Sequence, residues 1–422
     1  MCRGGQGQPR PTALSRRSLL TAAGAGGATY LYSSALGAPA QAARSDHRVY
    51  VLVMDGCRPG EINPILTPAL AALRSGGRNF PQAHSLPVME TIPNHVMMMT
   101  GARPDRTGVP ANAVYDRAEA TVRDLDRPTD LRFPTVIERL DAAGFTTGTV
   151  LSKEYLYGIF GGRATHRWEP APIVPISGHA PDLFTMEAAV TMVERLDPHL
   201  LFVNLGDIDR LGHTDLTGSS LQLLRQAALA GADLQVRRFV TMLKRTGRWQ
   251  RSVVVVLADH SMDWSLPHAV INLQPRFDAV PALAGKVAIA DNGGADLLYW
   301  TGPAAGRAAA LRRMREVALA TPGVLSVHTP RELRLGPEAG DLVVYCRAGW
   351  RFSDPAFYDN PIPGNHGHPA TRPIPFFIGG GSPLVRRGSS SVTATTADVA
   401  PTVGAVFGLP APRQGYDGRS LL

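Results

Sequence analysis

Short runs of apolar residues alternate along the chain with segments of helical periodicity. The nearly uninterrupted runs, which predict strands, lie at residues 49–54, 146–151, 200–205, 253–257 and 374–378. Continuous apolar runs are typical of parallel strands that are covered on both faces. Helices are predicted between them, at residues 67–74, 133–143, 183–196 and roughly 221–244. The alternation predicts an α/β fold, in which a doubly wound, mostly parallel sheet carries helices on both faces and binds ligands at the carboxyl ends of its strands.

Residues 265–360 interrupt this alternation with a pattern of their own. A strand at 295–300 and a helix at 308–320 precede two further strands, at 324–328 and 341–346. Proline and glycine gather near both ends of the segment, as is typical of domain boundaries. The pattern predicts a smaller α/β cap that is inserted into one core, between residues 43–264 and residues 361–422.

The first 42 residues have the pattern of an export signal. Arg16-Arg17 opens an apolar stretch rich in alanine and glycine, which ends in the small-x-small sequence Ala40-Gln41-Ala42. Paired arginines before an apolar stretch resemble the twin-arginine signal of a bacterial protein. We therefore expect the twin-arginine export machinery as a partner and a secreted, extracytoplasmic mature chain. No later stretch approaches about 18 uncharged apolar residues, so no membrane span is predicted in the mature chain.

Composition narrows the class of protein. The chain has 422 residues, of which 44% are hydrophobic and 18% charged, as expected of a globular protein. The formal net charge is +8, but residues 1–42 hold four arginines and no acid, so the remainder carries +4. Its basic residues are scattered among acids, and no stable nucleic-acid complex is predicted. Cys57 and Cys346 follow the signal. The sequence favours buried hydrophobic positions for both, leaves open whether they pair, and predicts no oligomeric state.

Side chains that can carry chemistry lie next to the predicted strands. In chain order they are Asp55, Lys153, Asp209 with His213, Asp259 with His260, and His366. The first six follow a strand, and the last lies a few residues before one. Because the carboxyl ends of parallel strands meet at one edge of a sheet, we expect these side chains to lie close together.

Three carboxylates and three imidazoles at one edge form a ligand set that suits Zn²⁺ and related dications. Without metal, the carboxylates of Asp55, Asp209 and Asp259 would repel one another and shift each other's pKa. Two dications would instead leave a net positive charge, which favours a phosphate ester. The sequence therefore predicts two divalent metal ions, with Zn²⁺ favoured, and a small phosphate-ester substrate.

Thr91 is the candidate nucleophile. Pro93 suits the first turn of a helix that continues through residues 96–99, so Thr91 lies at the N-terminus of that helix. Backbone N–H groups and the helix dipole favour an anion there. A threonine hydroxyl is a weak nucleophile at its own pKa and needs a metal ion to become reactive near neutral pH. The alternative role that the local sequence allows is a simple helix N-cap.

Taken together, these motifs resemble the alkaline phosphatase superfamily, and within it most closely the type I phosphodiesterase/nucleotide pyrophosphatase proteins. The resemblance rests on Asp55-Gly56-x-Arg58, Thr91-x-Pro93-Asn94-His95, Asn112, Asp209-x-x-Gly212-His213, Asp259-His260 and His366-Gly367. Residues 398–402 also resemble the last helix of the family, so the likeness covers nearly all of the mature chain. It implies an alkaline phosphatase-like fold and a hydrolase that acts on phosphoric ester bonds.

The resemblance also implies a role for each site residue. The implied ligands are Asp209, His213 and His366 for one metal ion, and Asp55, Asp259, His260 and the Thr91 oxygen for the other. Asp207 and His368 compete for the positions of Asp209 and His366. Asn112 would donate a hydrogen bond to a non-bridging phosphoryl oxygen. Thr91 would attack phosphorus and form a phosphothreonine, which is then hydrolysed.

Lys153 leaves the substrate class open. Related phosphomonoesterases and phosphonoacetate hydrolases carry a lysine here and a second cation two residues later, whereas this chain has Tyr155 at that position. Hydrolysis of a monoester or a phosphonate therefore stays open beside hydrolysis of a diester, and so does a solvated Lys153 without a catalytic role. A phospho-group transferase and a non-catalytic binding homologue are the further alternatives.

Overall fold

The structure, a computed structural model, describes residues 46–173, 178–217, 221–353 and 362–422. The predicted export signal, residues 1–42, lies outside the described residues and stays a prediction. The core elements that carry the candidate site lie within the described ranges.

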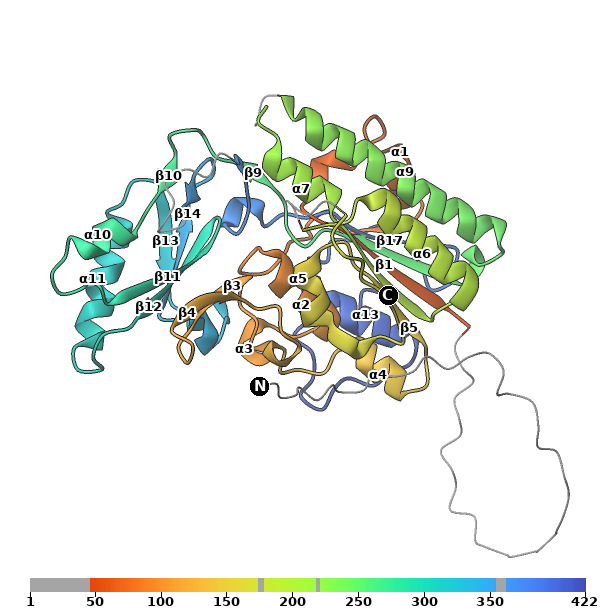
Figure 1. Cartoon of the computed structure of the whole chain (residues 1–422). Helices are drawn as coiled ribbons and strands as arrows, with labels where there is room; N and C mark the ends of the chain where they lie inside the picture. Colours follow the sequence, from red (N-terminus) through yellow and green to blue (C-terminus); the bar gives the residue numbers. More distant parts are fainter. Residues whose placement is uncertain (1–45, 174–177, 218–220, 354–361) are drawn as a thin grey trace, which may run out of the picture. The chain divides into compact units, whose positions relative to one another are not determined.

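An eight-stranded sheet forms the centre of the fold, with the strand order β18-β2-β17-β8-β1-β7-β5-β6 (Figure 1). Its strands are β1 (Arg48–Met54), β2 (Arg78–Asn79), β5 (Thr147–Val150), β6 (His166–Trp168), β7 (Leu200–Leu205), β8 (Ser252–Leu257), β17 (Phe376–Gly379) and β18 (Gly388–Ser389). The strands from β8 to β6 in this order run parallel, and every residue of β1, β7 and β8 is buried. Burial on both faces explains why these strands are continuous apolar runs in the sequence. The predicted doubly wound, mostly parallel sheet is confirmed.

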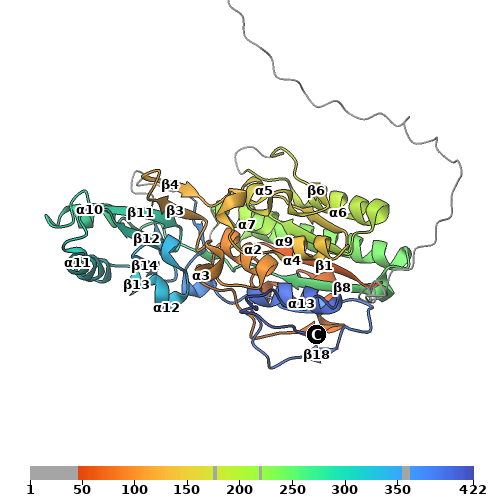
Figure 2. The same ribbon diagram turned by 90° about the horizontal axis from the view of Figure 1, so that it is seen from below.

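Helices cover both faces of this sheet. They include α1 (Pro68–Ser75), α2 (Thr91–Thr100), α3 (Pro104–Thr107), α4 (Val136–Ala142), α5 (Glu154–Phe160), α6 (Asp182–Leu196), α7 (Asp207–Thr214), α9 (Leu223–Arg245) and α13 (Val399–Val406). Helices α6 and α9 lie on one side of the sheet, and α13 lies on the other (Figure 2). Helix α4 begins later than the predicted residue 133 because Thr135 is its N-cap. The Thr135 hydroxyl accepts a hydrogen bond from the Glu138 N–H, 3.1 Å away.

The last strand of the core, β17, runs antiparallel to its neighbour β8. An apolar run carries no signal of strand direction, so the sequence did not predict this reversal. Because of it, the beginning of β17, rather than its end, lies at the edge where β8 ends. His366 therefore reaches the carboxyl edge of the parallel strands although it precedes its own strand.

A separate four-stranded antiparallel sheet lies within the predicted cap segment. Its strands, in sheet order, are β11 (Val287–Asn292), β12 (Ala295–Trp300), β14 (Leu342–Cys346) and β13 (Val324–His328). Helix α11 (Arg307–Leu319) packs on this sheet and shares an apolar core with it. The predicted strands and helix of the segment are present, whereas β11 was missed because its short alternating run ends in polar residues. The boundaries 265 and 360 stay predictions.

Further short helices and strands are β3 (Ala113–Asp116), β4 (Thr121–Asp124), β9 (Asp263–Trp264), β10 (Val270–Ile271), α10 (Gln274–Asp278), α12 (Pro330–Leu333), β15 (Arg351–Phe352) and β16 (Gly364–Asn365).

The hairpin formed by β3 and β4 contacts the small sheet. In the β3–β4 hairpin, the Ala113 N–H donates to Asn292 Oδ1 at 2.9 Å, and Asn292 Nδ2 donates to the Ala113 carbonyl at 3.0 Å. These paired hydrogen bonds hold the start of β3 against the end of β11.

Cys57 and Cys346, the two cysteines among the described residues, are buried and unpaired. Cys57 lies in the core of the central sheet, and Cys346 lies in the core of the small sheet. The interpretation of both as buried hydrophobic residues is confirmed.

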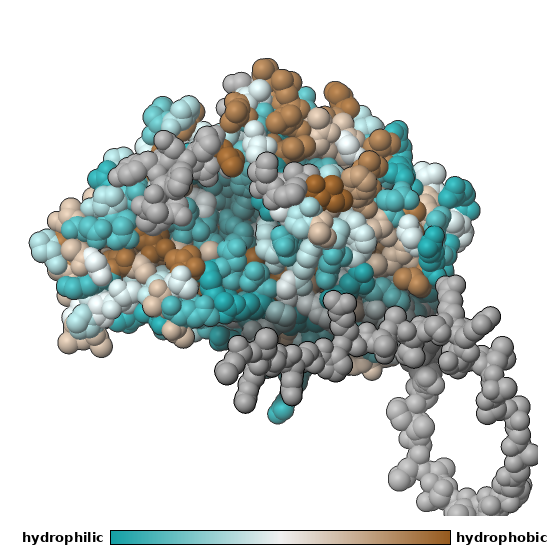
Figure 3. All heavy atoms as spheres, in the orientation of Figure 1, coloured by the Kyte–Doolittle hydropathy of each residue, from teal (hydrophilic) through white to brown (hydrophobic). Residues whose placement is uncertain are grey.

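Hydrophobic side chains gather on the surface over the N-terminal part of α9, at the top of Figure 3. The exposed leucines of this region are Leu216, Leu221, Leu223 and Leu224. Among the helices in the described ranges, none is long and apolar enough to cross a membrane.

Candidate active site

Segments from distant parts of the chain meet at the carboxyl edge of the central sheet. Strand β1 ends just before Asp55, and β8 ends shortly before Asp259 and His260. Strand β7 leads into α7, where Asp209 and His213 stand one helical turn apart and therefore face the same side. The short connections after these strands fix where each side chain points.

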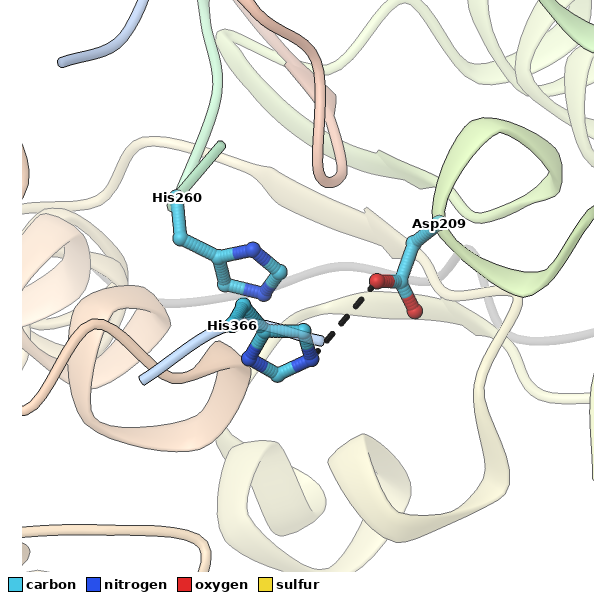
Figure 4. Close-up of side chains that lie close together, drawn as sticks. All are labelled: Asp209, His260 and His366. Atoms are coloured by element: carbon cyan, nitrogen blue, oxygen red, sulfur yellow. Dashed lines mark ion pairs between the residues drawn. The ribbon is translucent and has the colours of Figure 1, made fainter. Parts of the chain in front are cut away.

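Asp209, His213 and His366 form the first group of candidate ligands. His366 Nε2 lies 3.1 Å from His213 Nε2 and 3.7 Å from Asp209 Oδ1, and His213 Nε2 lies 3.3 Å from Asp209 Oδ1. Figure 4 shows the imidazole of His366 facing the Asp209 carboxylate. His213 Nδ1 lies 2.8 Å from the carbonyl oxygen of Gly364, an interaction that turns Nε2 toward the group. Ligand atoms this close together can share one ion.

The second group comprises Asp55, Asp259, His260 and Thr91. His260 Nε2 lies 3.8 Å from Asp55 Oδ1, 3.5 Å from Asp259 Oδ2 and 3.2 Å from Thr91 Oγ1. The His260 ring also stacks on the His366 ring, with centroids 3.8 Å apart, so the two groups adjoin (Figure 4). By mutual distance, His260 fits either group. The structure thus brings all seven predicted metal ligands into one cluster.

Thr91 is the first residue of α2, and Glu90 occupies the N-cap position. The alternative role of Thr91 as a simple N-cap is therefore wrong. Pro93 lies at the third position of the helix, still within its first turn. The Thr91 side chain is buried, and its hydroxyl is directed at the ligand cluster rather than at the helix backbone.

The donor set of the cluster fits divalent cations. Three carboxylate oxygens are buried without a hydrogen-bond partner among the described residues, namely Asp55 Oδ1, Asp209 Oδ1 and Asp259 Oδ2. Leaving such atoms buried and unpartnered is costly, and native structures rarely do so. Each of these oxygens lies within 4 Å of an imidazole nitrogen of the cluster. Zinc, which binds carboxylate oxygen and imidazole nitrogen together, would satisfy all three.

The charges of the cluster shift its titrating groups. Burial, and then the neighbouring Asp259, raise the pKa of Asp55. Burial, and then the ring of His366, lower the pKa of His260 well below its usual range, which favours the neutral imidazole that binds metal. Burial also opposes a charge on His366, but the Glu90 carboxylate beside it raises the pKa of this histidine to about 9.

Lys153 is fully buried between two of the candidate ligands. Its Nζ lies 2.7 Å from Asp55 Oδ2 and 2.6 Å from Asp209 Oδ2, which leaves Oδ1 of each carboxylate for the ligand groups. Burial opposes the charged amine, but Asp209 and Asp55 raise the pKa of Lys153. Burial likewise opposes ionisation of Asp209, but Lys153 and His213 hold the pKa of this carboxyl well below its usual range. The interpretation of Lys153 as a solvated lysine is wrong.

Asn112 lies beside Thr91, at the start of β3. Its Oδ1 accepts the N–H of Ile92 at 2.8 Å, and its Nδ2 donates to Glu90 Oε2 at 2.5 Å. An amide NH₂ carries two hydrogens, so one remains available to a ligand in front of Thr91.

The competing ligand candidates have other partners. Asp207 Oδ2 accepts the backbone N–H of Asp182 at 3.0 Å, and Asp207 Oδ1 lies 3.1 Å from His179 Nε2. His368 Nε2 lies 3.0 Å from Asp263 Oδ2. Neither Asp207 nor His368 belongs to the groups that could hold a metal ion among the described residues.

Sequence reasoning missed residues that contact the candidate metal ligands and fix their orientation. Asn204 Nδ2 donates to Asp55 Oδ2 at 2.9 Å, and Glu90 Oε1 lies 2.9 Å from His366 Nδ1. Asn204 is a polar residue within the otherwise apolar run of β7, which is the one signal that could have identified it. Glu90 gave no local signal, because its partner lies far away in the sequence.

Arg225 of α9 is the missed residue with the largest set of contacts. Its guanidinium pairs with both carboxylate oxygens of Glu61, at 2.7 and 2.8 Å, and donates to the carbonyls of Gly56 at 2.7 Å and Ile208 at 3.0 Å. These carbonyls adjoin the ligands that follow β1 and β7, so one buried side chain links both segments. A Cβ on Gly212 would lie 2.7 Å from Nη1, which explains the glycine of the α7 motif. Arginine in an amphipathic helix more often faces solvent, so the burial of Arg225 could not be predicted from the sequence.

A cavity of about 270 Å³ opens at the cluster. Its walls include Thr91, Asn112, Tyr155 and Arg210 from the core and the Asp291–Gly293 segment at the end of β11. The small sheet therefore contributes to the space in which a substrate would lie. A larger cavity, of about 610 Å³, lies against α10 and α11 and is lined by none of the predicted site residues.

Comparison with known proteins agrees with this arrangement. The family model for type I phosphodiesterase/nucleotide pyrophosphatase matches residues 49–369. Among solved structures, the chain is similar to murine ectonucleotide pyrophosphatase/phosphodiesterase 5, with a TM-score of 0.72 and 17% identity over 87% of this chain and 97% of that chain. The human protein of the same name gives a TM-score of 0.72 and 16% identity, over 88% and 97% of the two chains. No curated protein sequence matches the chain.

A second kind of enzyme shares the fold. Phosphonoacetate hydrolase from Sinorhizobium meliloti 1021 gives a TM-score of 0.66 and 19% identity, over 87% of this chain and 96% of that chain. The segment that matches the family model begins in β1 and ends after His366, so it contains every predicted metal ligand. The chain therefore belongs to the type I phosphodiesterase/nucleotide pyrophosphatase family of phosphoester hydrolases.

Proposed function

We propose that the chain hydrolyses phosphodiesters or nucleotide pyrophosphate bonds through a phosphothreonine at Thr91, beside two zinc ions. The observation that carries the proposal is the position of the Thr91 hydroxyl. It is buried at the N-terminus of α2, 3.2 Å from His260 Nε2, within a cluster of carboxylates and imidazoles. The family is metal-dependent, and the cluster offers two groups of ligands.

The ligand set divides between two ions. The residues that would hold them are Asp209, His213 and His366 for one, and Asp55, Asp259, His260 and Thr91 for the other. When bound, the two ions would lower the pKa of the threonine hydroxyl and neutralise charge on the phosphoryl group in transfer. The three unpartnered carboxylate oxygens of the cluster support this division.

Residues of the chain form the covalent intermediate and stabilise the charge that develops on the phosphoryl group. Thr91 Oγ1 gives its proton to water and bonds to phosphorus, while the bond from phosphorus to the leaving oxygen breaks and that oxygen takes a proton from water. Asn112 Nδ2 uses its second hydrogen to hold a non-bridging oxygen, and the N-terminus of α2 favours the negative charge that develops there. Water then attacks phosphorus, and the bond to Oγ1 breaks and restores Thr91. An added alcohol in place of water would give the transferase reaction, so product analysis with and without alcohols separates the two.

The surroundings of Lys153 favour a diester over a monoester or a phosphonate. A monoester carries more negative charge than a diester, and a second cation would be needed to hold it. Tyr155 and Arg210 line the cavity, whereas Lys153 is bound to two carboxylates and is not part of the lining. Hydrolysis of a monoester or of phosphonoacetate, the alternative function, would need Arg210, the cation in the lining, to hold the additional charge, or Lys153 to leave both carboxylates.

A similar protein supports the nucleophile and the substrate class. One structure of murine ectonucleotide pyrophosphatase/phosphodiesterase 5 contains AMP and an inactive variant in which a threonine is replaced by alanine. For this chain, that description favours Thr91 as the nucleophile and a nucleotide as substrate.

Replacement of the nucleophile tests the proposal. Thr91→Ala is expected to abolish turnover, by about 10⁴-fold or more, because it removes the hydroxyl that forms the covalent intermediate. Thr91→Ser keeps a hydroxyl and is expected to retain part of the activity. Rates on bis-p-nitrophenyl phosphate, p-nitrophenyl phosphate, ATP and phosphonoacetate, with zinc-loaded and chelator-treated enzyme, give the substrate class. Full activity of Thr91→Ala with unchanged zinc content, or activity that chelation leaves unaffected, would contradict the mechanism.

We also propose export of the mature chain through the twin-arginine machinery, with residues 1–42 as the signal. The paired arginines and the small-x-small ending support this route. Replacement of Arg16 and Arg17 by lysine is expected to leave the full-length chain inside bacterial cells, whereas the native signal is removed and the mature chain exported. Equal export of both versions would contradict the route.

A further inference from the structure

Glu90 lies between two functional parts of the candidate site. It is the residue before Thr91, it occupies the N-cap position of α2, and it is 3% exposed. Its two carboxylate oxygens have different partners. Oε1 lies 2.9 Å from His366 Nδ1, and Oε2 accepts a hydrogen bond from Asn112 Nδ2 at 2.5 Å.

We propose that Glu90 is a positioning residue that orients a metal ligand, His366, and a phosphoryl-binding amide, Asn112, with one carboxylate. This inference rests on the proposed function, because it takes its two targets from there. Glu90 lines the cavity at the cluster but belongs to neither group of possible metal ligands among the described residues.

The contact with His366 fixes the role of each ring nitrogen. A carboxylate at Nδ1 keeps the proton of the neutral imidazole on that nitrogen, so the lone pair lies on Nε2. Nε2 is the atom that faces the first ligand group, 3.1 Å from His213 Nε2 and 3.7 Å from Asp209 Oδ1. Glu90 therefore presents His366 to a metal ion in the tautomer and orientation that binding requires.

The contact with Asn112 fixes the direction of its amide. Asn112 Oδ1 accepts the backbone N–H of Ile92 at 2.8 Å, while Nδ2 donates to Glu90. A flipped amide would place its NH₂ against the Ile92 N–H and its oxygen against the carboxylate, so both hydrogen bonds would become repulsive contacts. The remaining hydrogen of Nδ2 is thereby held at the cavity that Thr91 and Asn112 line.

The backbone after His366 is shaped for the approach of Glu90. Gly367 has a φ of +101°, and a Cβ at this position would lie 2.8 Å from Glu90 Oε1 and 2.6 Å from the carbonyl of Asn292. A side chain at residue 367 would push the carboxylate away from His366. The His-Gly pair of the motif thus has physical reasons, which are a positive φ and room for the Asn292 carbonyl and the Glu90 carboxylate.

The isosteric variant Glu90→Gln tests the proposal. An amide has one oxygen where the carboxylate has two, so glutamine cannot present an oxygen both to His366 Nδ1 and to Asn112 Nδ2. We expect the zinc dissociation constant, measured by chelator competition, to rise about 10-fold to 100-fold. At saturating zinc we expect kcat to stay reduced with little change in KM, because the amide of Asn112 is no longer fixed. Asp263→Asn is the matched control, since it removes the carboxylate partner of His368, a histidine outside the predicted ligands. It is expected to bind zinc as tightly as the wild type.

A double-mutant cycle separates positioning from general structural damage. In an Asn112→Ala background, Glu90→Gln is expected to reduce kcat at saturating zinc far less than in the wild type, because the group it positions is already gone. Fully additive losses would overturn the Asn112 half of the proposal. A folded Glu90→Gln variant with zinc affinity within twofold of the wild type would overturn the His366 half. A wild-type chain that binds no zinc would instead overturn the proposed function.

Discussion

Carboxylates are buried in both sheets of the molecule, at the edge of the central sheet and within β12 of the small sheet. At the edge, Asp55, Asp209 and Asp259 each approach imidazoles, and each has one unpartnered oxygen. In the small sheet, Asp296 is 2% exposed, with an unpartnered Oδ1, and lies opposite Asp291 across the β11–β12 pair.

The two regions differ in how many unpartnered atoms converge. Three carboxylate oxygens beside shared imidazoles form a ligand set that cations can satisfy. A single buried carboxyl can be satisfied by a proton instead, since burial and then the charge of Asp291 raise the pKa of Asp296 well above its usual range. Burial of an acidic residue alone therefore does not indicate a site, whereas convergence of several unpartnered acids does.

The sharpest test of this difference neutralises one carboxylate in each region. Asp259→Asn is expected to reduce kcat/KM by more than about 100-fold and to lower the bound zinc, because a ligand of the second group is lost. Asp296→Asn is expected to keep both the rate and the zinc content. Metal analysis and steady-state kinetics on the two variants check this. Equal loss in both would mean that the edge cluster is not a ligand set.

The next largest effect is expected for Arg225, which links the segments that follow β1 and β7. Arg225→Met is expected to lower the free energy of unfolding by about 3–5 kcal/mol, because Glu61 and two backbone carbonyls lose their buried partner. The double variant Arg225→Met/Glu61→Gln is expected to recover part of that loss. Denaturant unfolding measures both. A single variant within about 0.5 kcal/mol of the wild type would contradict the linking role of Arg225.

Removal of metal ions is expected to lower the free energy of unfolding, because the ions bound at the ligand cluster of the central sheet are lost. An ion present at 100 times its dissociation constant stabilises the native state by about 2.7 kcal/mol, and chelation removes that contribution. Calorimetry is therefore expected to show a lower Tm after chelation for the wild type and for Asp296→Asn, but a much smaller change for Asp259→Asn. A wild-type Tm that chelation leaves unchanged would contradict the prediction.

The smallest expected effect is a pH-dependent gain in the small sheet. A carboxyl whose pKa is raised by folding contributes stability that is complete below its unfolded pKa and is lost as the pH rises through its folded pKa. Asp296 is such a group. Asparagine at this position cannot ionise, so the variant does not lose stability as the pH rises. We expect Asp296→Asn to be more stable than the wild type by about 1 kcal/mol or more at pH 8, with no gain near pH 3. Urea unfolding at both pH values measures it, and a variant less stable at pH 8 would contradict it.

The main features of the edge could be predicted because parallel strands share a carboxyl end. Asp55 and Asp259 follow apolar runs that alternate with helices, and this alternation predicts parallel neighbours for both strands, as observed for β1 and β8. Asp209 and His213 were equally accessible, since a separation of four residues places two side chains on one face of a helix. Thr91 was accessible from its place at a predicted helix N-terminus and from the need of its hydroxyl for a metal ion, whereas its place among the ligands of the second ion came from the family resemblance.

The remaining features depend on contacts between residues far apart in sequence, which no local pattern encodes. Glu90 meets His366, and Arg225 meets Glu61, across more than 150 residues in each case. The antiparallel direction of β17 could not be predicted either, because an apolar run does not indicate the direction of a strand. The burial of Lys153 could not be predicted because a lysine after a strand is usually solvated, and only the two facing carboxylates keep this one inside.

Anomalous diffraction at the zinc edge, from crystals of the zinc-loaded mature chain, tests whether the seven candidate ligands hold two zinc ions. We expect two peaks, one among Asp209, His213 and His366 and the other among Asp55, Asp259 and His260, with Thr91 Oγ1 beside the second. Peaks elsewhere, or a cluster that binds no zinc while the enzyme hydrolyses its substrate at full rate, would contradict it.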